Sequence, residues 1–328
     1  MKRVFVTLPL PAAGTDLLRQ RYQVEVVEAE GMPEAEVIER IKRLDPDGIV
    51  GMVNVPITDA IMAAAPSLKV IANYAVGYNN VDLEAATRRG ILVTNTPGVL
   101  TEATADLAFA LLLAVARRVV EGDRMVHDGR FKGWKADLLL GSDVYGRVLG
   151  VIGFGRIGQA VARRGLGFSM SILYYDARRA RPEVESDLRA VFVPLDELLR
   201  KADYVTIHAD LNADTRHLIS ERELRLMGPD HYLINAARGP IVDEKALVRA
   251  LKEGWIKGAA LDVYEHEPKL EPGLTECQNA VLLPHLGSAT VATRAAMAET
   301  AARNLIAALE GEVPPNLVNT EVMAAKKS

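Results

Sequence analysis

Short apolar runs rich in β-branched residues alternate with helical stretches along the chain, and this alternation restricts the fold more than any other feature. Up to about residue 100, strands are predicted at "RVFVT", "YQVEVV", "DGIVGM", "LKVIA" and "ILVT", separated by helical segments such as "PEAEVIERIKRL". From about Arg147 the pattern restarts with "RVLGVIG", "MSILYYD", "YVTIHA", "HYLINA", "IKGAALDV" and "AVLLP". Such alternation is typical of parallel sheets with helices on their faces. We therefore expect an α/β protein with two Rossmann-like, doubly wound parallel-sheet domains.

The segment between the two sets of strands, Thr101 to Gly129, is helical in composition. It is apolar on nearly every side from Leu107 to Ala116, and a helix without a polar face must be covered all round. Two interpretations stay open: a helix shared by the two domains, or one that also forms a subunit interface. Asp106, set in this apolar helix, is expected to satisfy a buried donor.

Composition excludes several classes of partner. At 328 residues the chain is long enough for two domains. Its 39 basic and 43 acidic residues leave a net charge of -4 without long runs of either sign, so neither nucleic acid nor an anionic membrane is an expected partner. The apolar start is interrupted by prolines, and the lone Cys277 has no neighbours at zinc spacing, so we expect a cytoplasmic protein without a metal site.

The stretch "VLGVIGFGRIGQAVARR" places Gly153, Gly155 and Gly158 directly after a strand and at the opening of a helix. The first glycine permits a tight turn, the second lets the backbone approach a diphosphate, and the third lets helix and strand pack closely. The diphosphate would lie at the positive end of the helix dipole, next to Arg156 and Ile157. This pattern predicts a dinucleotide-binding site.

The end of the next strand bears on which dinucleotide binds. Asp176 stands 18 residues after Gly158, where a carboxylate can accept hydrogen bonds from the ribose hydroxyls and repel a 2′-phosphate. Arg178 and Arg179 could instead hold that phosphate. We expect NAD(H) as the preferred cofactor, with NADP(H) as the alternative. The mixed-charge stretch "RRARPEVESDLR" that follows is expected to be a solvated segment.

Ionisable residues stand at the ends of three later strands. Arg238 ends one strand in "YLINAARGP", Asp262 ends the next in "GAALDVYEHEP", and His285 follows another in "LLPHLGSA". Ligands of doubly wound sheets bind at the carboxyl ends of the strands. These residues, with Glu267 close behind Asp262, therefore form a candidate catalytic edge.

These motifs together resemble the D-isomer-specific 2-hydroxyacid dehydrogenase family. The likeness rests on "GFGRIG", "INAARG", "LDVYEHEP" and "PHLGSA" in this order and extends over nearly the whole chain. Within the family, "LLGSDVYGRVLGVIGFGRIG" and "NLIAALEGEVPPNLVN" are most similar to glyoxylate and hydroxypyruvate reductases. The resemblance implies a substrate-binding domain of residues 1–100 to which 291–328 return, an NAD(P)-binding domain of 101–290, and an active site in the cleft between them.

The resemblance also assigns roles to single residues. The catalytic trio falls on Arg238, Glu267 and His285, and the loop that binds the substrate carboxylate falls on Val76 and Gly77. Further expected cofactor contacts are Ala236, Arg238, Asp262, His285 and Ser288. One departure is visible: the chain has Asp210 in "HADLN", a loop where family members often carry a proline.

The expected function is NAD(P)H-dependent reduction of a small 2-oxo acid, glyoxylate or hydroxypyruvate, to the D-2-hydroxy acid. Arg238 would bind the carboxylate and polarise the keto oxygen, His285 would donate the proton, and Glu267 would orient the imidazole. The alternatives are a reductase of 2-ketogluconate or another sugar acid, and an NAD-sensing binding protein similar to corepressors. The resemblance further implies a homodimer in which Trp134 shapes the substrate pocket of the neighbouring subunit.

Overall fold

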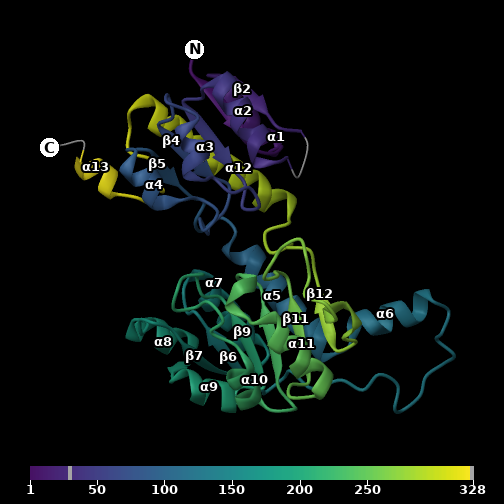
Figure 1. Cartoon of the computed structure of the whole chain (residues 1–328). Helices are drawn as coiled ribbons and strands as arrows, with labels where there is room; N and C mark the ends of the chain where they lie inside the picture. The colour runs from purple at the N-terminus through teal and green to yellow at the C-terminus, as the bar shows by residue number, and fades with distance from the viewer. Residues whose placement is uncertain (29–31, 326–328) are drawn as a thin grey trace. The chain divides into compact units, whose positions relative to one another are not determined.

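The chain folds into two compact units (Figure 1). The structure is a computed structural model and describes residues 1–28 and 32–325. Unit 1 comprises Met1–Leu100 together with a C-terminal segment that begins at Ser288, and unit 2 comprises Thr101–Gly287. The C-terminal range 291–328 assigned to the first domain falls in unit 1, except that residues 326–328 lie outside the described residues.

The described residues of unit 1 form five parallel strands in the order β2-β1-β3-β4-β5. The chain direction across the sheet reverses between β1 and β3, which makes the sheet doubly wound. The elements are β1 (Arg3–Val6), α1 (Ala12–Arg19), β2 (Gln23–Val26), α2 (Glu34–Leu44), β3 (Gly48–Gly51), α3 (Asp59–Ala63), β4 (Val70–Asn73), α4 (Leu83–Arg88), β5 (Leu92–Thr94), α12 (Val291–Glu310) and α13 (Glu321–Ala325).

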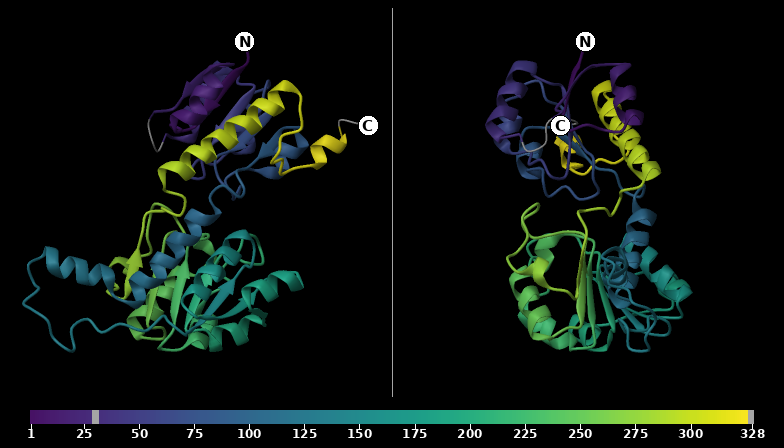
Figure 2. Two further views of the ribbon diagram at one scale, coloured as in Figure 1. Left: turned by 180° about the vertical axis from the view of Figure 1, so that it is seen from behind. Right: turned by 90° about the vertical axis from the view of Figure 1, so that its right-hand side faces the viewer.

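Helices cover both faces of this sheet because alternate strand residues point to opposite sides. Phe5, Ile49, Ile71 and Val93 form one apolar core with the buried residues of α2, α3 and α4. On the other face, the long helix α12 packs against α1 and against β3, β4 and β5 (Figure 2). Although it is near the C-terminus, helix α12 therefore covers one face of the N-terminal sheet and belongs to its core.

Unit 2 contains seven parallel strands in the order β12-β11-β10-β9-β6-β7-β8. The reversal lies between β6 and β9. The elements are α5 (Thr101–Ala116), α6 (Val119–His127), β6 (Val148–Ile152), α7 (Arg156–Gly167), β7 (Ser171–Tyr175), α8 (Pro182–Leu188), β8 (Ala190–Phe192), α9 (Leu195–Lys201), β9 (Tyr204–Ile207), α10 (Glu221–Met227), β10 (Tyr232–Asn235), the 3₁₀ turns Gly239–Ile241 and Leu274–Glu276, α11 (Glu244–Glu253), β11 (Gly258–Leu261) and β12 (Ala280–Leu282).

Two apolar cores flank the seven-stranded sheet. One contains the buried residues of α5 and α7 with Leu149 and Val151 of β6, and the other contains those of α9, α10 and α11 with Val205 and Ile207 of β9. With helices on both faces of two parallel sheets, the predicted fold class is confirmed.

Two expectations for unit 2 need correction. The predicted helix over Thr101–Gly129 is two helices, because Arg118 adopts a left-handed conformation with φ of 53°. Asp106 satisfies no buried donor, since its position on α5 is exposed and its carboxylate pairs with Arg164. The mixed-charge stretch after Asp176 is mostly exposed, as expected for a solvated segment; within it Pro182–Leu188 form helix α8, and the edge strand β8 follows.

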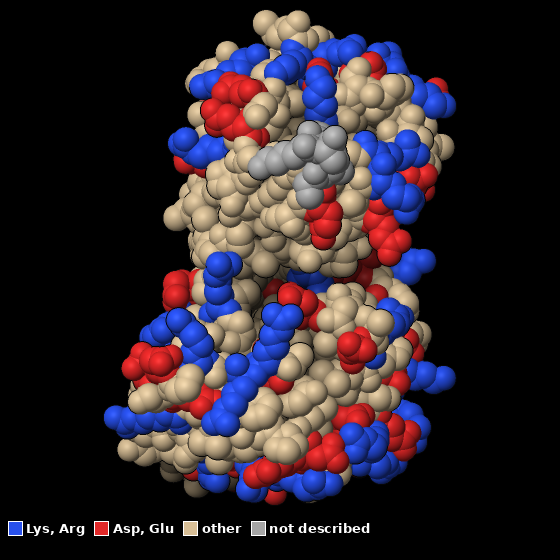
Figure 3. All heavy atoms as spheres, turned by 90° about the vertical axis from the view of Figure 1, so that its left-hand side faces the viewer, with Lys and Arg blue, Asp and Glu red and all other residues tan. Residues whose placement is uncertain are grey.

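The surface carries charges of both signs, in line with the near balance of basic and acidic residues in the sequence. Figure 3 shows lysine and arginine side chains interspersed with aspartate and glutamate on the face in view. Among the described residues, no helix is both long enough and apolar enough to span a bilayer.

Candidate active site

The register of the seven-stranded sheet brings the predicted site residues to one edge. Ile152 of β6 pairs with Tyr175 of β7 and with Ile207 of β9. Asn235 of β10 pairs in turn with Ile207 and with Leu261 of β11. The residues that follow these strands therefore leave the sheet at the same level, and they are Gly153, Asp176, His208, Ala236 and Asp262.

The three glycines after β6 differ in what a side chain would meet. Gly153 has φ of 88°, and a Cβ there would lie 2.4 Å from the backbone nitrogen of Ala209. A Cβ on Gly158 would lie 2.1 Å from the carbonyl oxygen of Gly153, so α7 can approach the turn only with glycine here. Gly155, the N-cap of α7, has open space where its Cβ would be. The loop thus has the turn, the close packing and the open cradle that a diphosphate requires.

Asp176 braces this glycine-rich loop from the end of β7. One carboxylate oxygen accepts a hydrogen bond from the backbone N–H of Phe154 at 2.7 Å, and the other accepts one from the N–H of Arg178 at 3.0 Å. An acidic side chain therefore stands beside the cradle. Arg156 is exposed and Ile157 partly buried in the first turn of α7.

Asp262 holds the loop that carries His285. Its two carboxylate oxygens accept hydrogen bonds from the N–H groups of Leu286 and Gly287, at 2.6 and 2.7 Å. His285 has φ of 57°, a left-handed conformation that is strained for a residue with a side chain and persists only where its surroundings enforce it. Burial raises the pKa of Asp262, an effect that the two loop N–H groups oppose. In the structure Asp262 is thus a positioning residue for the His285 loop.

His285 and Glu267 form a hydrogen-bonded pair, with 2.9 Å between His285 Nδ1 and Glu267 Oε2. The other oxygen of Glu267 accepts the N–H of Tyr264 at 2.9 Å. Burial alone would raise the pKa of Glu267, but the hydrogen bond and charge of His285, the N–H of Tyr264 and the charge of Arg238 outweigh it and lower that pKa. Glu267 is therefore an anion that accepts a hydrogen bond from Nδ1–H of His285, and Nε2 of His285 makes no hydrogen bond within residues 1–28 and 32–325, which leaves it for a ligand.

Arg238 lies in a tight turn at the end of β10. The side chain of Asn235 spans the turn, since its amide donates to the carbonyl of Arg238 at 3.0 Å and its oxygen accepts the N–H of Ala237 at 3.0 Å. Gly239 is required next, because a Cβ there would lie 1.9 Å from the backbone of Tyr264. Burial lowers the pKa of Arg238, and the charges of Glu267 and Asp210 oppose that shift.

In unit 1, the loop of Val76 and Gly77 is held by its carbonyl groups. The amide of Asn95 donates to the carbonyl of Val76 at 2.8 Å, and the amide of Asn73 donates to that of Gly77 at 2.8 Å. The N–H of Thr96 binds the preceding carbonyl of Ala75 at 2.9 Å. With the carbonyls engaged, the N–H groups of Val76 and Gly77 make no hydrogen bond to another described residue.

The remaining predicted site residues are scattered. Ala236 is buried at the carboxyl edge of the unit 2 sheet, whereas Ser288 is the first residue of the second segment of unit 1. Trp134 follows α6, and 84% of its surface is exposed in this single chain. The ring therefore has no packing partner of its own subunit, among the described residues, that would account for it.

Several residues that shape the site escaped the sequence analysis. Asn235, Asn73 and Asn95 end strands or follow them directly, and the signal for each is an asparagine beside a turn that carries a candidate ligand group. A second histidine–carboxylate contact joins His217 Nε2 and Glu265 Oε1 at 2.6 Å. His208 is partly buried, desolvation lowers its pKa to about 3, and its Nε2 contacts Thr206 at 2.9 Å. These partners are distant in sequence or buried, so spacing could not reveal them.

Comparisons with known proteins identify the family of the chain. Residues 109–287 match the D-isomer specific 2-hydroxyacid dehydrogenase, NAD binding domain. A glyoxylate reductase of Thermococcus gammatolerans is 52% identical over 330 residues, covering 99% of this chain and 98% of that protein.

Solved structures give the same result. A crystal structure of a protein from Thermus thermophilus is 50% identical with a TM-score of 0.90, covering 96% of this chain and 99% of that chain. An NADPH-dependent glyoxylate/hydroxypyruvate reductase from Sinorhizobium meliloti, in complex with NADP and malonate, is 33% identical with a TM-score of 0.85, covering 97% and 96%. On these matches, the chain belongs to the D-isomer specific 2-hydroxyacid dehydrogenase family.

Proposed function

We propose that this family member is a cytoplasmic enzyme that reduces glyoxylate or hydroxypyruvate to the corresponding D-2-hydroxy acid with a reduced nicotinamide cofactor. The observation that carries the proposal is the pair of His285 and Glu267, in the same unit as the glycine-rich loop and with Nε2 left for a ligand. Relatives of about the same length that are named glyoxylate reductase support the choice of substrate.

The residues of unit 2 supply binding and proton transfer. The reduced cofactor, when bound, supplies a hydride to the keto carbon. Arg238 binds the substrate carboxylate and polarises the keto oxygen, because its guanidinium is a permanent cation with forked donors. His285 donates the proton from Nε2 to the oxygen on which negative charge develops. Glu267 keeps the imidazole oriented by accepting the hydrogen bond from Nδ1.

The N–H groups of Val76 and Gly77 are proposed to bind the substrate carboxylate. Two observations support this assignment: the carbonyls of the loop are engaged by Asn73, Asn95 and Thr96, and backbone N–H groups are ready donors to an anion. A hydrogen bond to a charged group contributes about 1.5–3 kcal/mol. The loop would therefore contribute mainly to the KM for 2-oxo acids.

NADH is proposed as the preferred cofactor. Asp176 stands at the end of β7, where its carboxylate can accept hydrogen bonds from the ribose hydroxyls and its negative charge can repel a 2′-phosphate. The Sinorhizobium relative is NADPH-dependent, so the family does not decide the choice. The preference for NADH therefore rests on the residues around Asp176.

A homodimer is proposed, with the arm formed by α6 and the segment up to Tyr145 as its interface. Figures 1 and 2 show this arm extending away from the body of unit 2. Large apolar side chains are exposed on it, which is typical of an interaction surface: Val119, Val126, Phe131, Trp134, Leu140 and Tyr145. Trp134 would then contact the substrate bound by the second subunit. Light scattering at micromolar concentration tests the dimer, and a monomer would refute it.

Steady-state kinetics test the function. Glyoxylate, hydroxypyruvate, pyruvate and 2-ketogluconate are each assayed with NADH and with NADPH. We expect the highest kcat/KM for glyoxylate or hydroxypyruvate with NADH. Preference for 2-ketogluconate would overturn the substrate assignment, and the absence of turnover with every pair would overturn the enzyme assignment. Trp134→Ala should change the ratio of kcat/KM for hydroxypyruvate and glyoxylate more than it changes the affinity for NADH.

A further inference from the structure

Of the two arginines that follow Asp176, one is already engaged. The guanidinium of Arg179 makes two parallel contacts with Glu185, from Nε to Oε1 at 2.8 Å and from Nη2 to Oε2 at 2.9 Å. Glu185 lies in α8, and the ion pair raises the pKa of Arg179 and lowers that of Glu185. This bidentate geometry is the one that a guanidinium would otherwise offer to a phosphate.

Glu185 is itself fixed by the core of unit 2. The hydroxyl of Tyr174 donates to Glu185 Oε1 and accepts the N–H of Ala180 at 3.0 Å. Tyr174 is fully buried and stacks on Phe154 with ring centroids 4.0 Å apart. The N–H of Phe154 binds Asp176. The carboxylate that holds Arg179 is thus connected through two packed rings to the loop of the cofactor site, so Glu185 is held in place on its own side of the ion pair.

Arg178 differs from its neighbour. Its backbone N–H binds Asp176, and within residues 1–28 and 32–325 no ion pair of its side chain is found. Arg178 and Arg179 are therefore not equivalent candidates for a 2′-phosphate, because only Arg179 would have to leave a carboxylate first.

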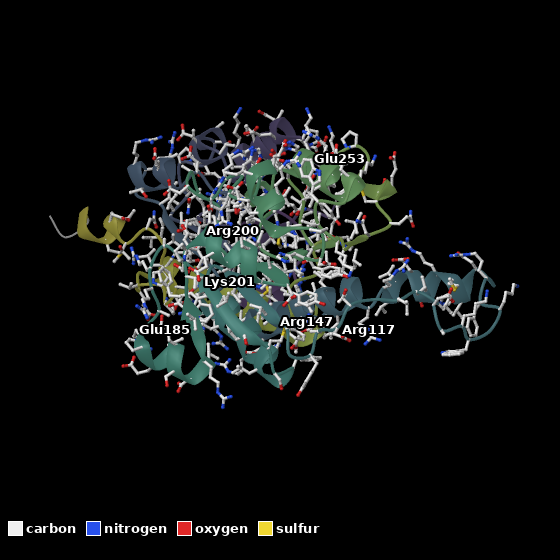
Figure 4. All side chains as sticks on the ribbon, turned by 90° about the horizontal axis from the view of Figure 1, so that it is seen from below. Arg117, Arg147, Glu185, Arg200, Lys201 and Glu253 are labelled. Carbon is white, nitrogen blue, oxygen red and sulfur yellow. The ribbon has the colours of Figure 1, made fainter. Side chains whose placement is uncertain are left out.

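We propose that Glu185 is a determinant of cofactor selectivity, because it occupies the guanidinium of Arg179 and withholds it from the 2′-phosphate of NADP(H). The inference rests on the proposed dinucleotide site beside Asp176. Figure 4 shows Glu185 at α8, on the opposite side of unit 2 from α6, so a change at Glu185 leaves the arm intact. Asp176 repels the 2′-phosphate, and Glu185 removes a cation that would attract it.

The test compares Glu185→Gln with Glu183→Gln. Glutamine keeps an acceptor for Tyr174 but removes the charge that holds Arg179. Glu183 is exposed in the first turn of the same helix, so its substitution removes an equal charge without releasing Arg179. Calorimetric titrations use adenosine 2′,5′-bisphosphate and ADP, and kinetics with NADPH and NADH follow. In Glu185→Gln we expect affinity for the bisphosphate to rise about fivefold, with affinity for ADP unchanged. Glu183→Gln should change the affinity for the bisphosphate by less than about twofold.

A second comparison uses the Arg179→Ala variant. In the wild-type background it should leave affinity for the bisphosphate unchanged, because Glu185 already occupies the guanidinium. In the Arg179→Ala background, Glu185→Gln should no longer have an effect. Equal changes in Glu185→Gln and Glu183→Gln, or an effect of Glu185→Gln that persists without Arg179, would overturn the proposal. Failure of the wild type to bind ADP or NADH is a different result, since it would overturn the dinucleotide site itself.

Discussion

Gly155→Ala separates cofactor binding from folding, because the structure leaves open space where the new methyl group would be. Gly155 has φ of -72°, which alanine adopts without strain. As an N-cap residue, alanine is poorer than glycine by about 0.5–1 kcal/mol. Replacing glycine by alanine also lowers the conformational entropy of the unfolded chain, which stabilises the fold by about 0.4–1 kcal/mol. The free energy of unfolding should therefore stay within roughly 0.5 kcal/mol of the wild type.

NADH binding should respond very differently. The methyl group would stand in the cradle and keep the diphosphate from the N–H groups at the start of α7. Loss of one charge-assisted hydrogen bond removes about 1.5–3 kcal/mol, which corresponds to roughly 10- to 100-fold weaker binding. Gly158→Ala should instead destabilise the fold by about 1–3 kcal/mol, because its Cβ would lie 2.1 Å from the Gly153 carbonyl oxygen.

The assay combines urea unfolding with calorimetric titration of NADH. Gly167→Ala, at the far end of α7 and also with open space at its Cβ, is the matched control and should bind NADH like the wild type. If Gly155→Ala binds NADH as tightly as the wild type, the diphosphate does not lie against this loop, and the reasoning from the glycine pattern fails.

Three further substitutions probe the chemistry. His285→Ala should lower kcat by about 10²- to 10⁴-fold and leave NADH affinity nearly unchanged, and near-normal kcat would show that another group donates the proton. Asn95→Ala should raise the KM for glyoxylate on the order of tenfold by releasing the Val76 carbonyl. Asn319 binds the backbone at Ile91 and Val93 and does not contact the Val76 carbonyl, so Asn319→Ala is the control and should leave the KM for glyoxylate unchanged. An equal rise of KM in both variants would contradict the role of Asn95. The pKa of Glu267 is lowered from its usual 4.5, so its ionisation stabilises the fold above that pH and the gain is lost on acidification. The difference in urea stability between wild type and Glu267→Gln should therefore shrink as pH falls below about 4.5, and a constant difference would contradict the assignment.

Much of the fold could be predicted from the sequence because β-branched runs and glycine spacing are local signals. Both parallel sheets, the turn after β6 and the residues at the strand ends could be inferred in this way. The short edge strand β8 was missed, since three residues next to a charged helix have little periodicity. Asp106 was misjudged because the apolar run hid an exposed stripe of α5.

What lay beyond reach of the sequence were side-chain pairs whose partners are far apart in the chain. The contact between Glu267 and His285 was expected only from the family resemblance. The clamps made by Asn95 and Asp262 depend on hydrogen-bond directions that a linear pattern does not contain. Nor does spacing show that Glu185 takes one of two adjacent arginines.

On the proposed preference for NADH, the brace that Asp176 makes with the N–H of Phe154 limits how the cofactor preference can be changed towards NADPH. Replacing Asp176 by a neutral residue removes the repulsion of the 2′-phosphate, but it also unties the loop that must receive either dinucleotide. Such a redesign would trade affinity for selectivity. Substitution at Glu185 acts on the same preference and leaves the brace in place, so an NADPH-dependent variant should begin from α8 rather than from the end of β7.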